Sequence, residues 1–292
     1  MVREYRYFVT DAYTDLSFVG NPSGIVLTEG KMTDEEMLKA ARELKHSETT
    51  CIRRLDKDIY HVRYFSPVCE VSLSGHAALA TFWTLAELGY IDGREDNLRI
   101  RQYTKAGALH VDFQFNNGEI RFVDIELPKM KIATEVEDVA SVAEAFKLTE
   151  ASIGCEKGLK PAVIDAGIKT MIIPLNSRDL LHTMVPKRRR MEELTEKYGA
   201  QCYHLFYYDG TSRVDQRNFS PAVGIWEESG TGTGSGAMYF YLREKGLLDG
   251  EKITCYQGDE VGRPSEIVLK EKNGSIYAGG RACVVMEGIM RL

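Results

Sequence analysis

Short segments in which apolar, β-branched and aromatic residues alternate or cluster recur along the whole chain. Runs of this length, bounded by turn residues, predict β-strands. Asn116-Asn117-Gly118 separates two of them, and Asn and Gly adopt positive φ at low cost, so these two strands are predicted to form an antiparallel hairpin. The predicted strands cover residues 5–11, 24–27, 49–53, 60–65, 98–101, 108–113, 120–127, 163–175, 203–208, 253–257, 265–270 and 275–278.

Three segments show helical periodicity instead. In Asp34 to Leu44 the apolar residues share one face, and Thr33 precedes them as a candidate N-cap. Ala77 to Leu88 and Ala237 to Leu242 are strongly apolar, which is typical of a helix buried inside a sheet or barrel. Because strands outnumber helices in both halves of the chain, the pattern predicts an α+β fold.

The chain contains a repeated sequence motif, which we call the internal echo. The sequence Arg-Tyr-Phe-Ser-Pro at 63–67 precedes one predicted buried helix, and Arg-Asn-Phe-Ser-Pro at 217–221 precedes the other. The two Phe-Ser-Pro triplets lie 219 − 65 = 154 positions apart, which predicts two domains of similar design. We expect a first domain at 1–127 and a second at 128–283, with the tail 284–292 returning to the first.

Composition supports this organisation and excludes several functions. A chain of 292 residues exceeds the usual single-domain size, and a mean hydropathy of −0.27 with 27% charged residues is ordinary for a soluble globular protein. The net charge of −6 argues against nucleic acid as a partner, and the basic run at 187–190 resembles a solvated loop entering a helix. With no signal-like N-terminus and no run long enough for a membrane span, we expect a cytoplasmic protein that binds no membrane.

The six cysteines are scattered and form no C-x-x-C pair, and no histidine pair lies near them. Reduced core thiols are the simplest interpretation, and no metal site is expected.

Two glycine-containing turns precede the predicted buried helices, Ser74-Gly75-His76 and Thr231-Gly232-Thr233-Gly234-Ser235. Backbone N–H groups and the helix dipole at such starts favour an anion, and a small carboxylate is the natural ligand. The alternative is that each glycine only supplies turn geometry. Residues 232–237 also match a loose dinucleotide pattern, but neither the buried strand that this motif requires nor a Walker lysine is present, so no cofactor is expected.

Three further residues could carry chemistry. His76 lies beside a helix start, where the positive dipole would lower its pKa, although a histidine that only satisfies local backbone groups fits equally well. From its position between a helix and an apolar strand, Glu48 would be a surface carboxylate. Glu70 could form a salt bridge or contact a ligand.

Four stretches together resemble the PhzF-like family over nearly the whole chain. They are residues 11–22, the Ser47-Glu48-Thr49 turn, residues 63–77, and residues 219–232. The resemblance implies a diaminopimelate-epimerase-like architecture: two pseudo-symmetric domains, each a mostly antiparallel curled sheet or barrel around a central helix, with the active site between them.

The resemblance also implies residue roles. The family's acid/base glutamate falls on Glu48, and the substrate-holding histidine of the Gly-His-Ala turn falls on His76. A family aspartate falls on Glu228, a departure that keeps the charge but adds a methylene. Gly75 and Ser74 at one helix start, and Thr231, Gly232 and Thr233 at the other, complete the predicted substrate-binding set.

The sequence therefore predicts a cofactor-independent isomerase, a homodimer in which Glu48 moves a proton within a small carboxylate-bearing substrate. A glutamate in this role works best with its pKa raised by partial burial. One alternative is a proline-racemase-like epimerase or dehydratase, in which Ser74 and Thr231 would replace the two thiols of that chemistry. A non-catalytic binding protein with the same fold is the other.

Overall fold

The computed structural model describes residues 2–93, 95–154, 158–248 and 252–292, so Cys155 lies outside the described residues. The chain divides into two compact units, Met1–Pro128 with Tyr277–Leu292, and Lys129–Ile276. The sequence placed the first boundary one residue earlier and the return to the first unit at 284. In the structure the return begins at Tyr277, because β17 (Ser275–Gly280) pairs with β8 (Glu119–Glu126) of the first unit.

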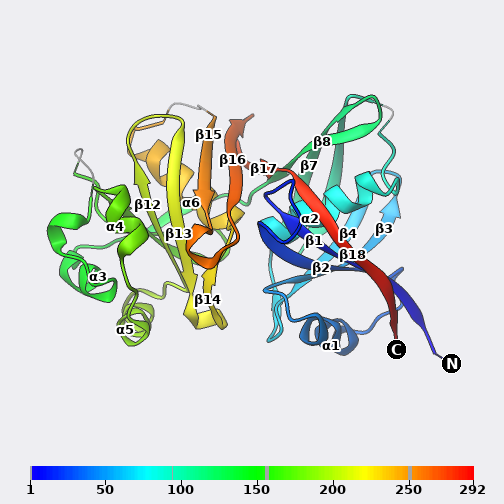
Figure 1. Ribbon diagram of the computed structural model, residues 1–292, viewed down its shortest axis with the longest axis horizontal. Coiled ribbons are helices and arrows are strands. Elements are labelled where there is room, and N and C mark those ends of the chain that lie inside the picture. The colour runs from blue at the N-terminus through cyan, green and yellow to red at the C-terminus, as the bar shows by residue number, and fades with distance from the viewer. Residues whose placement is uncertain (1, 94, 155–157, 249–251) are drawn as a thin grey trace. The chain divides into compact units, whose positions relative to one another are not determined.

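The first unit is a curved sheet around one buried helix (Figure 1). The helix, α2, packs against strands of both ends of the chain, and its residues from Gly75 to Ala86 are all buried. Its strand pairs are antiparallel except for β2–β3 and β4–β6. The remaining elements are β1 (Glu4–Ala12), β2 (Asn21–Leu27), α1 (Asp34–Leu44), β3 (Thr49–Asp56), β4 (Ile59–Phe65), β5 (Glu70–Val71), α2 (Gly75–Glu87), β6 (Asn97–Thr104), β7 (Gly107–Asn116) and β18 (Ala282–Arg291).

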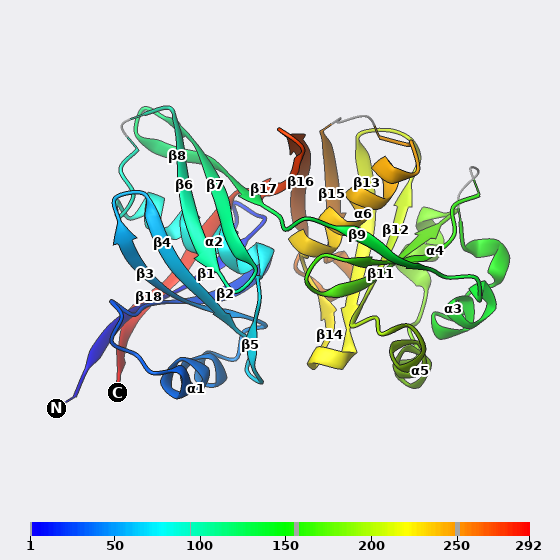
Figure 2. The same cartoon turned by 180° about the vertical axis from the view of Figure 1, so that it is seen from behind.

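The second unit also packs a central helix, α6, against a mostly antiparallel sheet (Figure 2). The smaller helices α3, α4 and α5 contribute residues to an apolar core in this unit. Its elements are β9 (Lys131–Glu135), α3 (Val139–Ala145), β10 (Ala162–Asp165), β11 (Lys169–Leu175), α4 (Arg178–Thr183), α5 (Arg188–Tyr198), β12 (Cys202–Tyr208), β13 (Arg213–Ser220), β14 (Ile225–Glu228), α6 (Gly232–Glu244), β15 (Ile253–Gln257) and β16 (Ser265–Lys272).

The two units repeat one order of strand pairing. In the first, β2–β3 is parallel, β3–β4 antiparallel, β4–β6 parallel and β6–β7 antiparallel. In the second, β11–β12, β12–β13, β13–β15 and β15–β16 follow the same sequence of directions. The Phe-Ser-Pro triplets end β4 and β13 respectively, so the internal echo corresponds to two copies of one design, and the α+β prediction is confirmed.

Local chemistry explains several element boundaries. Thr33 forms a capping box with Glu36, and α1 ends at Lys45 in the left-handed conformation (φ 58°). Asn117 and Gly118 both have positive φ, 54° and 80°, between β7 and β8, which confirms the predicted hairpin. The predicted strand 163–175 is two strands, β10 and β11, separated by a turn with Gly167 at φ 87°.

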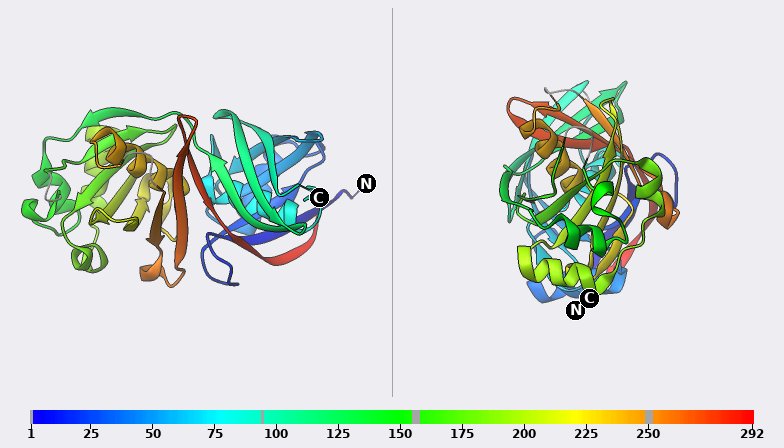
Figure 3. Two further views of the ribbon diagram at one scale, coloured as in Figure 1. Left: turned by 90° about the horizontal axis from the view of Figure 1, so that it is seen from above. Right: turned by 90° about the vertical axis from the view of Figure 1, so that its left-hand side faces the viewer.

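Both ends of the chain belong to the first unit, where they lie side by side (Figure 3). Strand β1 pairs with β18 from Glu4↔Arg291 to Ala12↔Ala282, with an irregularity at Val9/Thr10. Within the described ranges, no helix has the length and apolar character needed to cross a membrane.

Candidate active site

Glu48 lies in the turn between α1 and β3, and its main chain is anchored to β2. Its carbonyl oxygen accepts hydrogen bonds from the Gly24 N–H at 3.3 Å and from the Ser23 hydroxyl at 3.1 Å. A side chain at Gly24 would not fit, because a Cβ there would lie 2.8 Å from Thr49 Oγ1. The Glu48 side chain is 14% exposed, so it is not the surface carboxylate that its sequence context suggested.

His76 occupies the first turn of α2, directly beside this carboxylate. Its Nε2 lies 3.3 Å from Glu48 Oε2 and 3.3 Å from the Ser47 hydroxyl. Its Nδ1 lies 3.3 Å from the hydroxyl of Ser74, the N-cap residue of α2. The structure therefore brings together four residues that the sequence analysis placed at this site, Glu48, Ser74, Gly75 and His76, all within the first unit.

The imidazole of His76 is neutral. Burial lowers its pKa to about 3, and electrostatic repulsion from the nearby His46 side chain acts in the same direction. The sequence analysis expected the right direction of the shift but attributed it to the helix dipole. The Glu48–His76 contact is thus a carboxylate facing an uncharged ring and not an ion pair.

The contact with Ser74 favours one tautomer of that ring. Its hydroxyl oxygen accepts the Ala77 N–H as the cap of α2, so its own hydrogen is available to Nδ1 at 3.3 Å. A neutral ring that accepts at Nδ1 carries its proton on Nε2. The neighbours of Nε2 at 3.3 Å are Glu48 Oε2 and the Ser47 hydroxyl.

Each unit braces the loop before its central helix with a bidentate arginine–glutamate pair. In the first unit, Arg63 donates to Glu70 at 2.8 and 3.0 Å, which shows that Glu70 forms a salt bridge. In the second unit, Arg217 donates to Glu227 at 2.7 and 3.0 Å. The second pair places the backbone immediately before Glu228, so the echo extends from strand order to side-chain contacts.

The remaining predicted residues lie together in the second unit. Glu228 ends β14 and is 8% exposed, while Thr231 is the N-cap of α6. Gly232 is buried and Thr233 half-buried in the first turn of that helix. Unlike Ser74 at the start of α2, Thr231 accepts no hydrogen bond from the first turn of its own helix.

The cysteine and metal predictions can also be compared with the structure. Cys51 and Cys255 are buried free thiols, but Cys69 is exposed and Cys202 and Cys283 are half-buried, so the prediction of core thiols is wrong for these three. Among the residues that the structure describes, no group of three or more His, Cys, Asp or Glu side chains is arranged to hold a metal ion.

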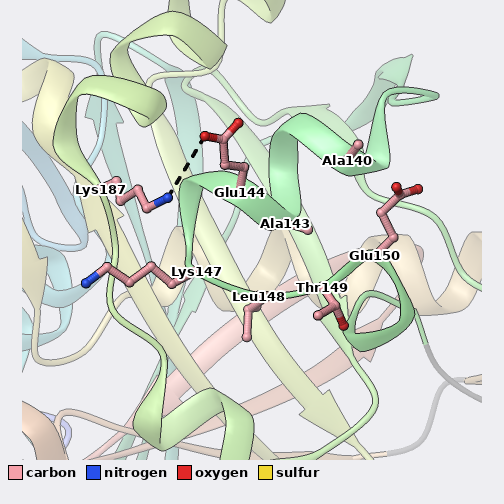
Figure 4. A pocket seen from close by; sticks show the side chains of 8 residues that line it. All are labelled: Ala140, Ala143, Glu144, Lys147, Leu148, Thr149, Glu150 and Lys187. Atoms are coloured by element: carbon pink, nitrogen blue, oxygen red, sulfur yellow. Dashed lines mark ion pairs between the residues drawn. The ribbon is translucent and has the colours of Figure 1, made fainter.

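A hollow of about 460 Å³ lies elsewhere in the second unit, between α3, the segment after it and Lys187 (Figure 4). Lys187 Nζ lies 4.0 Å from Glu144 in this hollow, and Arg190 contacts Glu144 at 2.8 Å and Glu193 at 2.7 Å. Arg188 lies over the Trp226 ring at 5.0 Å. Lys187 is the N-cap of α5 and residues 188–190 form its first turn, so the prediction of a loop is wrong for these three residues, which contact groups of their own chain.

Comparison with known proteins agrees with the fold. The family model described as phenazine biosynthesis-like protein matches residues 10–288. An uncharacterized isomerase of Deinococcus radiodurans is 31% identical, over 97% of this chain and 94% of its own length. The trans-2,3-dihydro-3-hydroxyanthranilate isomerase of Pseudomonas fluorescens is 25% identical, over 97% of this chain and all of its own length.

The solved structures include the PhzF-family phenazine biosynthesis protein of Bacillus anthracis, which superposes with a TM-score of 0.81 at 26% identity and covers 99% of both chains. The predicted fold is thereby confirmed. The match of the family model over nearly the whole chain, together with the isomerase relatives, shows that this chain belongs to the phenazine biosynthesis-like protein family and is an isomerase.

Proposed function

We propose that this isomerase works without a cofactor and that Glu48 moves a proton within a small carboxylate-bearing substrate. The contact between Glu48 Oε2 and His76 Nε2, 3.3 Å apart and largely shielded from water, is the observation that carries the proposal. A partly buried carboxylate beside a ring that is uncharged at neutral pH is a suitable general base.

The state of His76 restricts the roles that the two residues can take. An imidazole whose pKa is about 3 does not pick up a proton at neutral pH, so we assign the moving proton to Glu48. His76 serves as a hydrogen-bond donor through Nε2–H. It orients the carboxylate of Glu48 or, once substrate is bound, a polar group of the substrate.

The reaction then needs one base. Glu48 removes a proton from an activated carbon, holds it as a carboxylic acid, and returns it to another carbon on the same face of the substrate. The double bond shifts, and no atom is gained or lost. General acid/base catalysis of this kind contributes about 10²- to 10⁴-fold, and positioning must supply the remaining acceleration.

The substrate-binding groups in this proposal are Ser74, Gly75 and His76 in the first unit, and Glu228, Thr231, Gly232 and Thr233 in the second. The similarity to a trans-2,3-dihydro-3-hydroxyanthranilate isomerase supports a cyclic, unsaturated amino or hydroxy acid as the substrate class. The homodimer stays a prediction.

The test follows solvent deuterium incorporation by mass spectrometry. Wild-type protein is incubated in D₂O with cyclic and unsaturated amino and hydroxy acids that include trans-2,3-dihydro-3-hydroxyanthranilate. Glu48→Gln is compared with the control Glu70→Gln, which removes another partly buried carboxylate of the same unit, one that pairs with Arg63.

We expect exchange into one compound that is lost in Glu48→Gln and kept in Glu70→Gln. Exchange that survives in Glu48→Gln would remove the role given to Glu48. If no compound exchanges with wild-type protein, the proposed substrate class is contradicted.

A further inference from the structure

In the second unit, three buried polar side chains form a hydrogen-bonded series that ends at the segment 228–231. Gln257 is the member of this series that contacts the segment. Gln257 is 3% exposed, and the residues behind it, Gln216 and His204, are 2% and 0% exposed. Polar groups this deeply buried are costly unless they are hydrogen-bonded, and these three bond to one another. Core packing alone would be served by apolar residues.

The carboxamide of Gln257 forms hydrogen bonds with both ends of the segment 228–231. Its Oε1 accepts the Thr231 N–H at 3.1 Å, and its Nε2 donates to the Glu228 carbonyl at 2.7 Å and to the Thr231 hydroxyl at 3.1 Å. A backbone N–H can only donate and a carbonyl can only accept. These contacts therefore fix the orientation of the carboxamide without ambiguity.

The orientation of the Gln257 carboxamide determines the orientation of Gln216 behind it. Because Gln257 Oε1 is an acceptor, Gln216 presents its Nε2 to it at 2.9 Å and its Oε1 to His204 Nε2 at 3.0 Å. Burial lowers the pKa of His204 to about 4, so its ring is neutral and carries its proton on Nε2. Its Nδ1 lies 3.2 Å from Oδ1 of Asn218, whose Nδ2 donates to the Ser220 hydroxyl at 3.2 Å.

The hydrogen bonds of Gln257 to Thr231 change which groups are available at the start of α6. The Thr231 hydroxyl accepts from Gln257 and does not cap the first turn of the helix, whereas the Ser74 hydroxyl caps the first turn of α2. The Thr231 N–H is also taken by Gln257. The donors that α6 can offer an anion are therefore the N–H groups of Gly232, Thr233 and Gly234.

We propose that Gln257 is a positioning residue that holds the Thr231 hydroxyl away from α6, so that the first-turn N–H groups stay available to a carboxylate. This inference rests on the proposed function, in which Thr231, Gly232 and Thr233 bind the substrate carboxylate. Gln257 itself touches no substrate. It acts through the segment 228–231.

The test uses sodium acetate as the carboxylate probe and the full chain labelled with ¹⁵N. Acetate is titrated while the amide signals of Gly232, Thr233 and Gly234 are followed by NMR. Gln257→Met removes the carboxamide at nearly constant volume. Gln102→Met is the matched control, because Gln102 is a fully buried glutamine of the first unit that bonds to the Tyr64 hydroxyl at 2.8 Å.

We expect saturable shifts of these amides in the wild type, an affinity at least about tenfold lower in Gln257→Met, and no change in Gln102→Met. If Gln257→Met does not fold, Gln216→Met replaces it, because this variant keeps the contacts of Gln257 with the segment 228–231 and removes the side chain that donates to Gln257 Oε1 from behind. A smaller loss is then expected.

Equal acetate affinity in wild type and Gln257→Met would overturn the inference, as would the absence of any acetate-dependent shift at these amides in the wild type. The readout involves neither Glu48 nor turnover. Failure here would leave the deuterium-exchange result for Glu48 standing, and loss of the Glu48 role would leave the acetate result standing.

Discussion

The two arginine–glutamate braces allow one interaction to be tested at two degrees of burial in the same molecule. Arg217 and Glu227 are 7% and 8% exposed, whereas Arg63 and Glu70 are 18% and 23% exposed. Arg217 also donates through Nη1 to the Leu181 carbonyl at 3.1 Å and the Met184 carbonyl at 3.3 Å. The third contact of Arg63 is Asp34, which is 82% exposed.

Replacing either arginine by methionine keeps the apolar stem and removes the charge. Arg217→Met leaves a buried carboxylate and buried carbonyls without their donor, and breaking such a pair costs about 3–5 kcal/mol. Arg63→Met leaves groups that water can reach, and a partly exposed pair contributes about 1 kcal/mol. With a urea m-value of about 2 kcal/mol per M, the unfolding midpoints should fall by roughly 2 M and 0.5 M.

The two tryptophans make the comparison specific for each unit, because Trp83 lies in α2 of the first unit and Trp226 in β14 of the second. Fluorescence-detected unfolding in Trp83→Phe and Trp226→Phe backgrounds follows one unit at a time. A midpoint shift for Arg63→Met that equals or exceeds the shift for Arg217→Met would refute the reasoning from burial.

Two further predictions concern buried histidines. His76 and His204 have folded-state pKa values lowered to about 3 and about 4 from 6.5, so the unfolded chain binds more protons below pH 6.5. Stability is therefore full above pH 6.5 and falls as the pH drops, by up to about 1.4 kcal/mol per pH unit for each histidine; urea midpoints that stay level between pH 7 and 5 would contradict this. Gly234→Ala should lower stability by about 1–3 kcal/mol, because its Cβ would lie 2.7 Å from His204 Nδ1; a double-mutant cycle with His204→Ala should remove most of that cost, and independent effects would argue against the clash.

The apolar pattern was a good guide wherever burial and periodicity coincide. Helix α1 was predicted with its bounds and its cap, because its amphipathic face packs on the sheet and its first turn carries the capping box. Strand β13 was missed. Its sequence, RVDQRNFS, is polar at most positions, yet it is buried from Val214 onward because Gln216, Arg217 and Asn218 find partners on neighbouring elements.

The candidate site was predictable in its residues but not in its contacts. The meeting of Glu48 and His76 depends on the register of β3 against β2 and on the course of α2, which no local pattern encodes. The family resemblance supplied that pairing. Gln257 was predicted only as the end of a strand, because a glutamine in a strand carries no sign of the segment that it holds.

The place of β18 in the first unit has a consequence for how the protein is made. Residues 129–276, which form the whole second unit, are translated between β1 and the strand that completes the sheet beside it. At about 5–20 residues per second, this interval lasts roughly 7 to 30 s, and at its end the second unit has all of its strands while the first still lacks β18. Until β18 is translated, one edge of β1 has no partner strand. An unpaired strand edge can bind chaperones or pair with the wrong strand.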